Sequence, residues 1–323
     1  MWPRWLTATP ASRSPSKLSL SLFPVLLLIV SILKGLGLME TTLIGIGGIN
    51  LRIKLPERSF QLDESYLPFL VHSVSTIGEW DVHPEPIPQS IMLLDNRSRT
   101  SRIRDIRQSN GKLLFRLWWE PYAPAPWKAA IMEPAGNQGE IWLNQREEES
   151  LSYPLFAIDL LIFPYLLISN SGIIIHTAAV KTEAGVYLFP APSGGGKSTW
   201  SDLMAAHPEW TVLGEDKVIV RKVNNSYQVF GTPWNPRPEY RGDDHAPLIG
   251  IYFLRHGREN RISKIGKADI AKKLLQAAAL PFQKRDELDK VLTIIDEIAQ
   301  TVPAYQFGFR PDQSALDYFQ CFI

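Results

Sequence analysis

A glycine-rich loop between an apolar stretch and a helix-forming stretch constrains the fold of this 323-residue chain more than any other feature. The loop covers residues 191–199 (Ala-Pro-Ser-Gly-Gly-Gly-Lys-Ser-Thr), and residues 185–189 before it (Gly-Val-Tyr-Leu-Phe) are mostly apolar. We predict a strand at 185–189 and a helix from Ser198 to Ala206 that ends before Pro208. A strand, a glycine loop and a helix in this order are typical of an α/β core.

The loop has the Walker A pattern, with Ala191 in place of the usual first glycine. Small residues let main-chain N–H groups converge on a polyphosphate, and the helix N-terminus adds partial positive charge. Lys197 would reach the β- and γ-phosphates, Ser198 would place its hydroxyl on Mg²⁺, and Thr199 would support the helix start. The alternative is a glycine-rich turn with an unrelated lysine. The predicted nucleotide-binding residues are Ser193, Gly194, Gly195, Gly196, Lys197, Ser198 and Thr199.

Two adjacent acids follow a second predicted strand at residues 210–213. In a parallel sheet, the carboxyl end of a strand beside the loop faces the bound nucleotide. Glu215 and Asp216 could there hold Mg²⁺ or accept the proton of an attacking hydroxyl, and we predict Asp216 and Ser198 as metal ligands. Adjacent residues of a continuing strand point to opposite sides, so only one acid would face the site. A surface turn is the alternative.

His176 ends the apolar run 173–175, in a strand that we expect to neighbour the loop strand. Two interpretations stay open: a core histidine with satisfied hydrogen bonds, or a catalytic group that orients a carboxylate or touches the transferring phosphoryl. The other five histidines show no metal-ligand spacing.

Charge and cysteine content exclude several classes of protein. The chain has 34 basic and 33 acidic residues, so no overall field attracts nucleic acid, and we expect no nucleic-acid partner. Cys321 is the only cysteine, which excludes an internal disulfide and a cysteine-rich zinc site. The length favours two domains.

Alternating polar and apolar residues at 50–55, 112–119 and 140–143 predict strands, so residues 39–150 form a β-rich N-terminal domain. The second domain, 151–323, begins with a stretch at 151–168 that is apolar apart from Asp159. We interpret this stretch as a buried helix, because its prolines and central acid disfavour a membrane span. Five tryptophans are interpreted as core rather than as a stacking platform: Trp80, Trp118, Trp119, Trp127 and Trp142.

Two further segments allow more than one interpretation. Residues 97–107 hold five arginines and one aspartate, which fits a solvated strand edge or a docking surface for an acidic partner. Residues 1–38 form a basic, apolar leader that fits a signal peptide, a membrane anchor, or a misplaced start before Met39. An enzyme that uses ATP belongs on the ATP side of the membrane, so we expect a cytoplasmic protein, anchored if the leader is real.

Three features together resemble the catalytic domain of HPr kinase/phosphorylase: the run ending in His176, the loop ending in Gly-Lys-Ser at 196–198, and the acids Glu215 and Asp216. The resemblance implies an α/β fold whose P-loop core is related to ATP-dependent phosphoenolpyruvate carboxykinase. In that family an Asp-Asp pair follows the loop, and its first acid is the general base. Glu215 occupies that position with one methylene more, so Asp216 stays a second candidate.

Residues 231–234 (Gly-Thr-Pro-Trp), 250–254 and 302–305 extend the likeness, over 151–323, to shorter HPr-kinase-related proteins of peptide-modification gene cassettes, the SynChlorMet type. The resemblance implies a serine kinase that uses ATP and Mg²⁺ on a peptide or small protein, with modifying enzymes as further partners. The signature for phosphorolysis is missing, and a homo-oligomer stays open. Two rival functions are a nucleotide-binding scaffold that presents a peptide to modifying enzymes, and a carboxykinase-like enzyme acting on a small organic acid.

Overall fold

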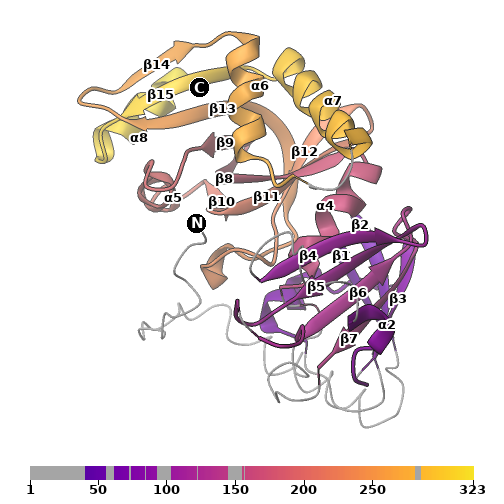
Figure 1. The fold of residues 1–323 in the computed structure, drawn as a ribbon. Helices are drawn as coiled ribbons and strands as arrows, with labels where there is room; N and C mark the ends of the chain where they lie inside the picture. The colour runs from indigo at the N-terminus through magenta and orange to yellow at the C-terminus, as the bar shows by residue number, and fades with distance from the viewer. Residues whose placement is uncertain are drawn as a thin grey trace, which may run out of the picture.

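The chain folds into a mixed α/β structure with two β-sheets, shown in Figure 1. This computed structural model describes residues 41–55, 62–72, 74–83, 85–92, 103–121, 123–144, 155, 157–280 and 285–323. The leader at 1–38 and the first part of the arginine-rich segment, 97–102, lie outside the described residues. No helix among the described residues is both long enough and apolar enough to cross a membrane.

The first sheet has the strand order β1-β2-β3-β7-β6-β5-β4. Strand β3 pairs in parallel with β2 and β7, and the other neighbours are antiparallel. The strands predicted at 50–55, 112–119 and 140–143 are confirmed as β2, β5 and β7. The elements are β1 (Thr41–Ile46), β2 (Ile49–Lys54), the 3₁₀ helix η2 (Glu64–Phe69), β3 (Gly78–His83), α2 (Gln89–Met92), β4 (Arg104–Ser109), β5 (Lys112–Leu117), β6 (Lys128–Met132) and β7 (Gln138–Leu143).

The tryptophans of this half are buried with one exception. Trp80, Trp118, Trp127 and Trp142 lie in the interior, as expected. Trp119 is 52% exposed and contacts the ring of Trp127 edge to face, so the core interpretation is wrong for this residue. It follows strand β5 at the start of a proline-containing loop, where strand alternation no longer applies.

The second sheet has the order β10-β8-β11-β12-β13-β15-β14, and β9 pairs with β8 and β13. Its strands are β8 (Gly172–Thr182), β9 (Gly185–Pro190), β10 (Thr211–Gly214), β11 (Lys217–Val223), β12 (Ser226–Phe230), β13 (His245–His256), β14 (Arg261–Lys264) and β15 (Ala304–Phe309). The helices of this half are α4 (Asp159–Ser169), α5 (Lys197–Ala205), η4 (Pro238–Tyr240), α6 (Lys267–Ala277), α7 (Arg285–Thr301) and α8 (Gln313–Phe322).

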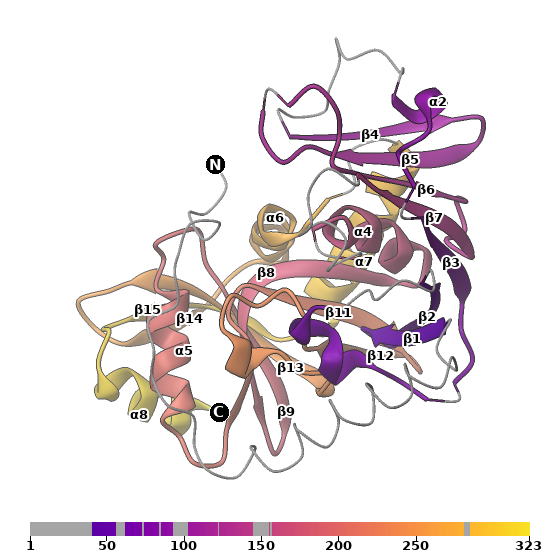
Figure 2. The same ribbon diagram turned by 90° about the horizontal axis from the view of Figure 1, so that it is seen from below.

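Helices cover this sheet on both faces because side chains of β8 alternate between them. Ile173 and Ile175 pack with Ile270 of α6 and Val291 of α7. On the other face, apolar residues of β8 and β9 pack with α5 and α8: Ala178, Val180, Phe189, Trp200, Met204, Leu316 and Phe319. Figure 2 shows α6 and α7 on one side of β8, with α5 on the other.

Helix α4 lies where the two sheets meet (Figures 1 and 2). The expected helix at 151–168 is found from Asp159 to Ser169, while 151–154 and 156 lie outside the described residues. Leu161, Phe163 and Leu166 of α4 belong to one apolar cluster with residues of both sheets. Residues of both sheets thus cover α4, which explains why its side chains are apolar. Its first residue, Asp159, is the exception: it is charged and also buried.

Candidate functional site

The glycine loop connects β9 to α5 in the expected order, with each predicted boundary correct to within one residue. Gly194 and Gly196 have φ angles of +76° and +95°, a region that L side chains rarely adopt. A Cβ atom on Gly196 would lie 2.7 Å from the Phe309 ring, whereas Gly194 faces open space. The Gly195 N–H donates to the Pro192 carbonyl at 2.9 Å. Gly196 is thus required for the backbone to turn into α5.

Lys197 is the first residue of α5, and its side chain is nearly buried inside the curve of the loop. Its ammonium donates to the carbonyl oxygens of Ala191 at 2.7 Å and Pro192 at 3.3 Å. Burial lowers the pKa of Lys197, and the negative charges of Asp216 and Glu215 oppose this shift. Both carboxylates therefore favour the charged form of the ammonium.

Strand pairing explains why the acids and the loop meet. Strand β8 is antiparallel to both β9 and β10, so β9 and β10 run in the same direction and end at one edge. The two strands are not direct neighbours as in a parallel sheet, because β8 lies antiparallel between them. Glu215 and Asp216 occupy the connection between β10 and β11, not a continuing strand. His176 pairs opposite Lys217, and the next residue pairs opposite the end of β9. The predicted neighbourhood of the histidine strand and the loop strand is confirmed.

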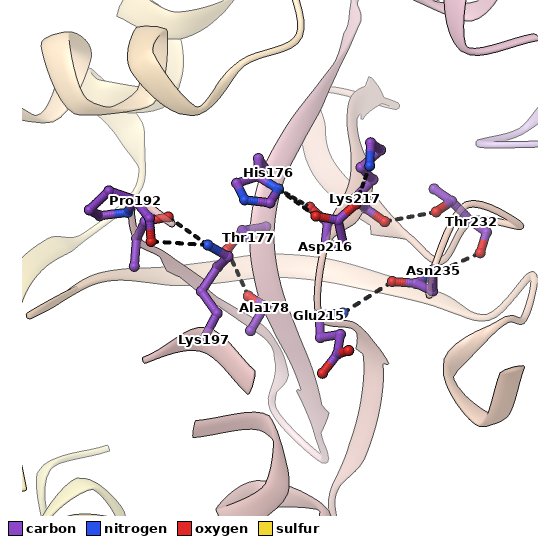
Figure 3. Close-up of polar contacts among 11 residues, drawn as sticks. His176, Thr177, Ala178, Pro192, Lys197, Glu215, Asp216, Lys217, Thr232 and Asn235 are labelled. Carbon is purple, nitrogen blue, oxygen red and sulfur yellow. Dashed lines mark hydrogen bonds and ion pairs between the residues drawn. The ribbon is translucent and has the colours of Figure 1, made fainter. Parts of the chain in front are cut away.

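Asp216 lies between two basic side chains, as Figure 3 shows. Nδ1 of His176 is 2.8 Å from Oδ1 of Asp216 and 2.8 Å from its main-chain oxygen. The ammonium of Lys217 contacts the other carboxylate oxygen. Burial disfavours the charged form of Asp216, but His176 and Lys217 outweigh it and lower its pKa to about 2. Asp216 is therefore ionised at neutral pH, and His176 orients it.

Glu215 points away from Asp216 (Figure 3) and has different partners. Its side chain is 7% exposed, and its Oε1 lies 3.2 Å from Nε of Arg237. Its Oε2 has no hydrogen-bond partner among the described residues. Burial raises the pKa of Glu215, while Arg237 opposes the rise. The two acids are thus different in basicity, with Glu215 the more basic.

The remaining predicted residues lie on the open side of the loop. Ser193, Ser198 and Thr199 are exposed, and the last two lie in the first turn of α5. No group of three His, Cys, Asp or Glu side chains converges in the described ranges. The Ser198 hydroxyl and the acid carboxylates are nevertheless hard oxygen donors of the kind that Mg²⁺ takes together with water and phosphate oxygens. The donor set fits that ion.

Two residues that contact Glu215, Asn235 and Arg237, were not predicted from the sequence. Arg237 pairs with Glu215 and with Asp202 of α5. Oδ1 of Asn235 accepts the main-chain N–H of Glu215 at 3.1 Å. Both lie in an irregular, proline-rich segment without hydrophobic periodicity. The only signal was the run at 231–234, to which no role was assigned.

No protein-family model matches the chain, and no curated protein matches it. The functional interpretation is therefore carried by the residues themselves. Within one edge of the second sheet, the structure brings together the loop with Lys197, the acids Glu215 and Asp216, and His176.

Proposed function

We propose that this chain is a Mg²⁺- and ATP-dependent kinase that transfers the γ-phosphoryl group to a serine hydroxyl of a peptide or small protein. One observation carries the proposal: a glycine loop holding Lys197 lies at the same sheet edge as two acids of unequal basicity. This arrangement supports a P-loop core like that of HPr kinase/phosphorylase and phosphoenolpyruvate carboxykinase. ATP is the co-substrate, so we place the enzyme in the cytoplasm.

The loop is the proposed binding site for the triphosphate. Its main-chain N–H groups and the start of α5 favour negative charge. Lys197 would leave the carbonyls of Ala191 and Pro192 and turn toward the β- and γ-phosphate oxygens. Ser198 and Asp216 would hold Mg²⁺, which when bound neutralises charge on the phosphate oxygens.

Glu215 is the proposed general base. In the transfer, the serine oxygen forms a bond to the γ-phosphorus, the bond to the β,γ-bridging oxygen breaks, and the hydroxyl proton passes to Glu215. A base needs a pKa near the working pH, and burial moves Glu215 in that direction. Asp216 is a poor base with a pKa of about 2, but a permanently ionised carboxylate suits a metal ligand. His176 holds Asp216 in position.

A second candidate function is a nucleotide-binding scaffold that presents a peptide to modifying enzymes. The Arg237 contact favours it, because an ion pair on Oε1 stabilises the carboxylate and makes proton uptake by Glu215 harder. Such a protein would bind Mg-ATP and leave it intact.

The test combines Mg-ATP calorimetry with transfer of labelled phosphate to serine-containing peptides. The wild-type protein should bind and transfer, and Lys197→Ala should lower transfer by about 10²–10³-fold or more. Lys181→Ala is the matched control, because Lys181 lies on β8 of the same sheet and pairs with Asp244 on the surface. Binding without labelled product would favour the scaffold. No heat on titrating Mg-ATP, or full transfer by Lys197→Ala, would refute the proposal.

A further inference from the structure

Asp159 is a buried acid at the start of the otherwise apolar helix α4. Its side chain is 1% exposed, and Oδ2 accepts hydrogen bonds from the Tyr66 hydroxyl and, at 2.6 Å, from Nε1 of Trp234. Oδ1 accepts the N–H of Leu160 at 2.8 Å. Tyr66 belongs to η2 in the first half of the chain, and Trp234 follows β12 in the second. One carboxylate thus joins both halves.

Trp234 lies in the 231–241 segment, which contacts Glu215 through Asn235 and Arg237. Its ring packs edge to face on Phe163 of α4, with centroids 5.3 Å apart. The next residue, Asn235, accepts the Glu215 N–H, and its amide donates to the carbonyls of Thr232 at 3.1 Å and Tyr240 at 3.2 Å. Asn235 is therefore held rigidly on both sides.

The same segment contacts the acid pair at two further points. The Thr232 hydroxyl donates to the Lys217 carbonyl at 2.7 Å, just after the acids. Arg237 contacts the Glu215 carboxylate and also Asp202 of α5, the helix that follows the loop. The main chain on either side of Asp216 and the side chain of Glu215 therefore depend on where the 231–241 segment lies.

We propose that Asp159 is a positioning residue for Glu215: it holds Trp234, and through Trp234 and Asn235 it fixes the conformation of the acid pair. Burying a carboxylate in an apolar helix is costly. Burial raises the pKa of Asp159 to about 6, although the hydrogen bonds that its carboxylate accepts oppose this rise. An apolar residue would pack on α4 without this cost, but it would offer no acceptor to Trp234. The catalytic consequence depends on the proposed function, whereas the structural link does not.

Trp234→Phe and Tyr66→Phe form a matched pair of variants. Each removes one donor to the same oxygen of Asp159 and keeps an aromatic ring. Only Trp234→Phe releases the segment that holds Glu215. Asp159→Asn is a further variant, which replaces the charged acceptor of Trp234 with a weaker neutral one and should therefore act like Trp234→Phe with a smaller effect.

Amide hydrogen exchange at Glu215 is the primary measurement, because it needs neither nucleotide nor turnover. We expect about 5- to 10-fold faster exchange of this N–H in Trp234→Phe than in Tyr66→Phe, the size of one lost hydrogen bond. Transfer assays should show kcat lowered by a similar factor in Trp234→Phe alone, with unchanged affinity for Mg-ATP.

The outcomes separate the two proposals. Equal exchange at Glu215 in both variants would overturn the positioning role of Asp159, whether or not the wild-type protein transfers phosphate. Faster exchange in both Trp234→Phe and Asp159→Asn, together with no transfer by the wild-type protein, would support the positioning role and count against the kinase. If Trp234→Phe fails to fold, Asp159→Asn decides by the same exchange measurement.

Discussion

The two sheets differ in how completely their buried charged side chains are paired. In the first sheet, Arg116 and Asp105 are buried as a pair, and Arg116 also donates to main-chain carbonyls of α2. In the second sheet, Lys197 and the acids 215 and 216 lie at an edge beside an exposed loop, and one carboxylate oxygen of Glu215 has no partner among the described residues. A satisfied interior pair stabilises a fold, whereas an incompletely satisfied group at an accessible edge can act on a ligand.

The largest effect is expected from breaking the charge pair of the first sheet. Arg116→Met removes the buried cation of Asp105 and leaves it with the partly exposed Arg107, so it should lower the free energy of unfolding by about 2–3 kcal/mol. Denaturant unfolding measures the loss, and calorimetry of the remaining folded protein should give unchanged Mg-ATP affinity. A loss below about 1 kcal/mol, or weakened Mg-ATP binding, would contradict the division between the two sheets.

Glu215→Gln tests the other side of the comparison. Transfer should fall by about 10²-fold or more because the amide cannot accept the proton, while unfolding and Mg-ATP affinity change little. Wild-type transfer should decline as pH falls through the raised pKa of Glu215, since only the ionised form is a base, and this decline should vanish in the variant. Asp216→Asn serves as the comparison. Because Asp216 is the proposed Mg²⁺ ligand, this variant should raise the Mg²⁺ concentration needed for half-maximal transfer. If Asp216→Asn instead removed the pH dependence, the roles of the acids would be reversed.

Two glycines give the smallest and most closely matched test. Gly196 in the loop and Gly111 between β4 and β5 have φ angles of +95° and +83°. Alanine at either position should cost about 1–2 kcal/mol of stability for left-handed backbone, with a larger loss at Gly196, where the Cβ meets Phe309. Only Gly196→Ala should weaken Mg-ATP binding in calorimetry. If both variants bound Mg-ATP as tightly as the wild-type protein, the loop would not be the nucleotide-binding site.

Local features of the second half could be predicted from sequence. The strand, loop and helix around Gly196 follow from short-range rules: apolar residues, then glycines, then helix formers before Pro208. The direction of β8 could not be predicted, because strand pairing depends on distant partners. The prediction that the loop and the acids share one sheet edge is correct, but its reason is only partly correct. The prediction assumed that β9 and β10 are neighbours, whereas β8 runs antiparallel between them.

Contacts made by irregular segments were not predictable. Arg237 and Asn235 reach the acid pair from a proline-rich stretch about 20 residues further along the chain, which has no periodic pattern. Asp159 was noticed only as an exception in an apolar run, and its partner Tyr66 lies 93 residues away. Such contacts arise from tertiary packing, which a single sequence does not show.

The apolar cluster that spans both sheets limits how this chain can be divided. Ile174 and Ile219 of the second sheet pack in one cluster with Trp80 of the first sheet and Leu166 of α4. A truncated version that kept only the second sheet would present these isoleucines to water, a patch of the kind that drives aggregation. The half without the glycine loop thus covers an apolar surface of the other half, and we expect neither half to be stable when expressed alone.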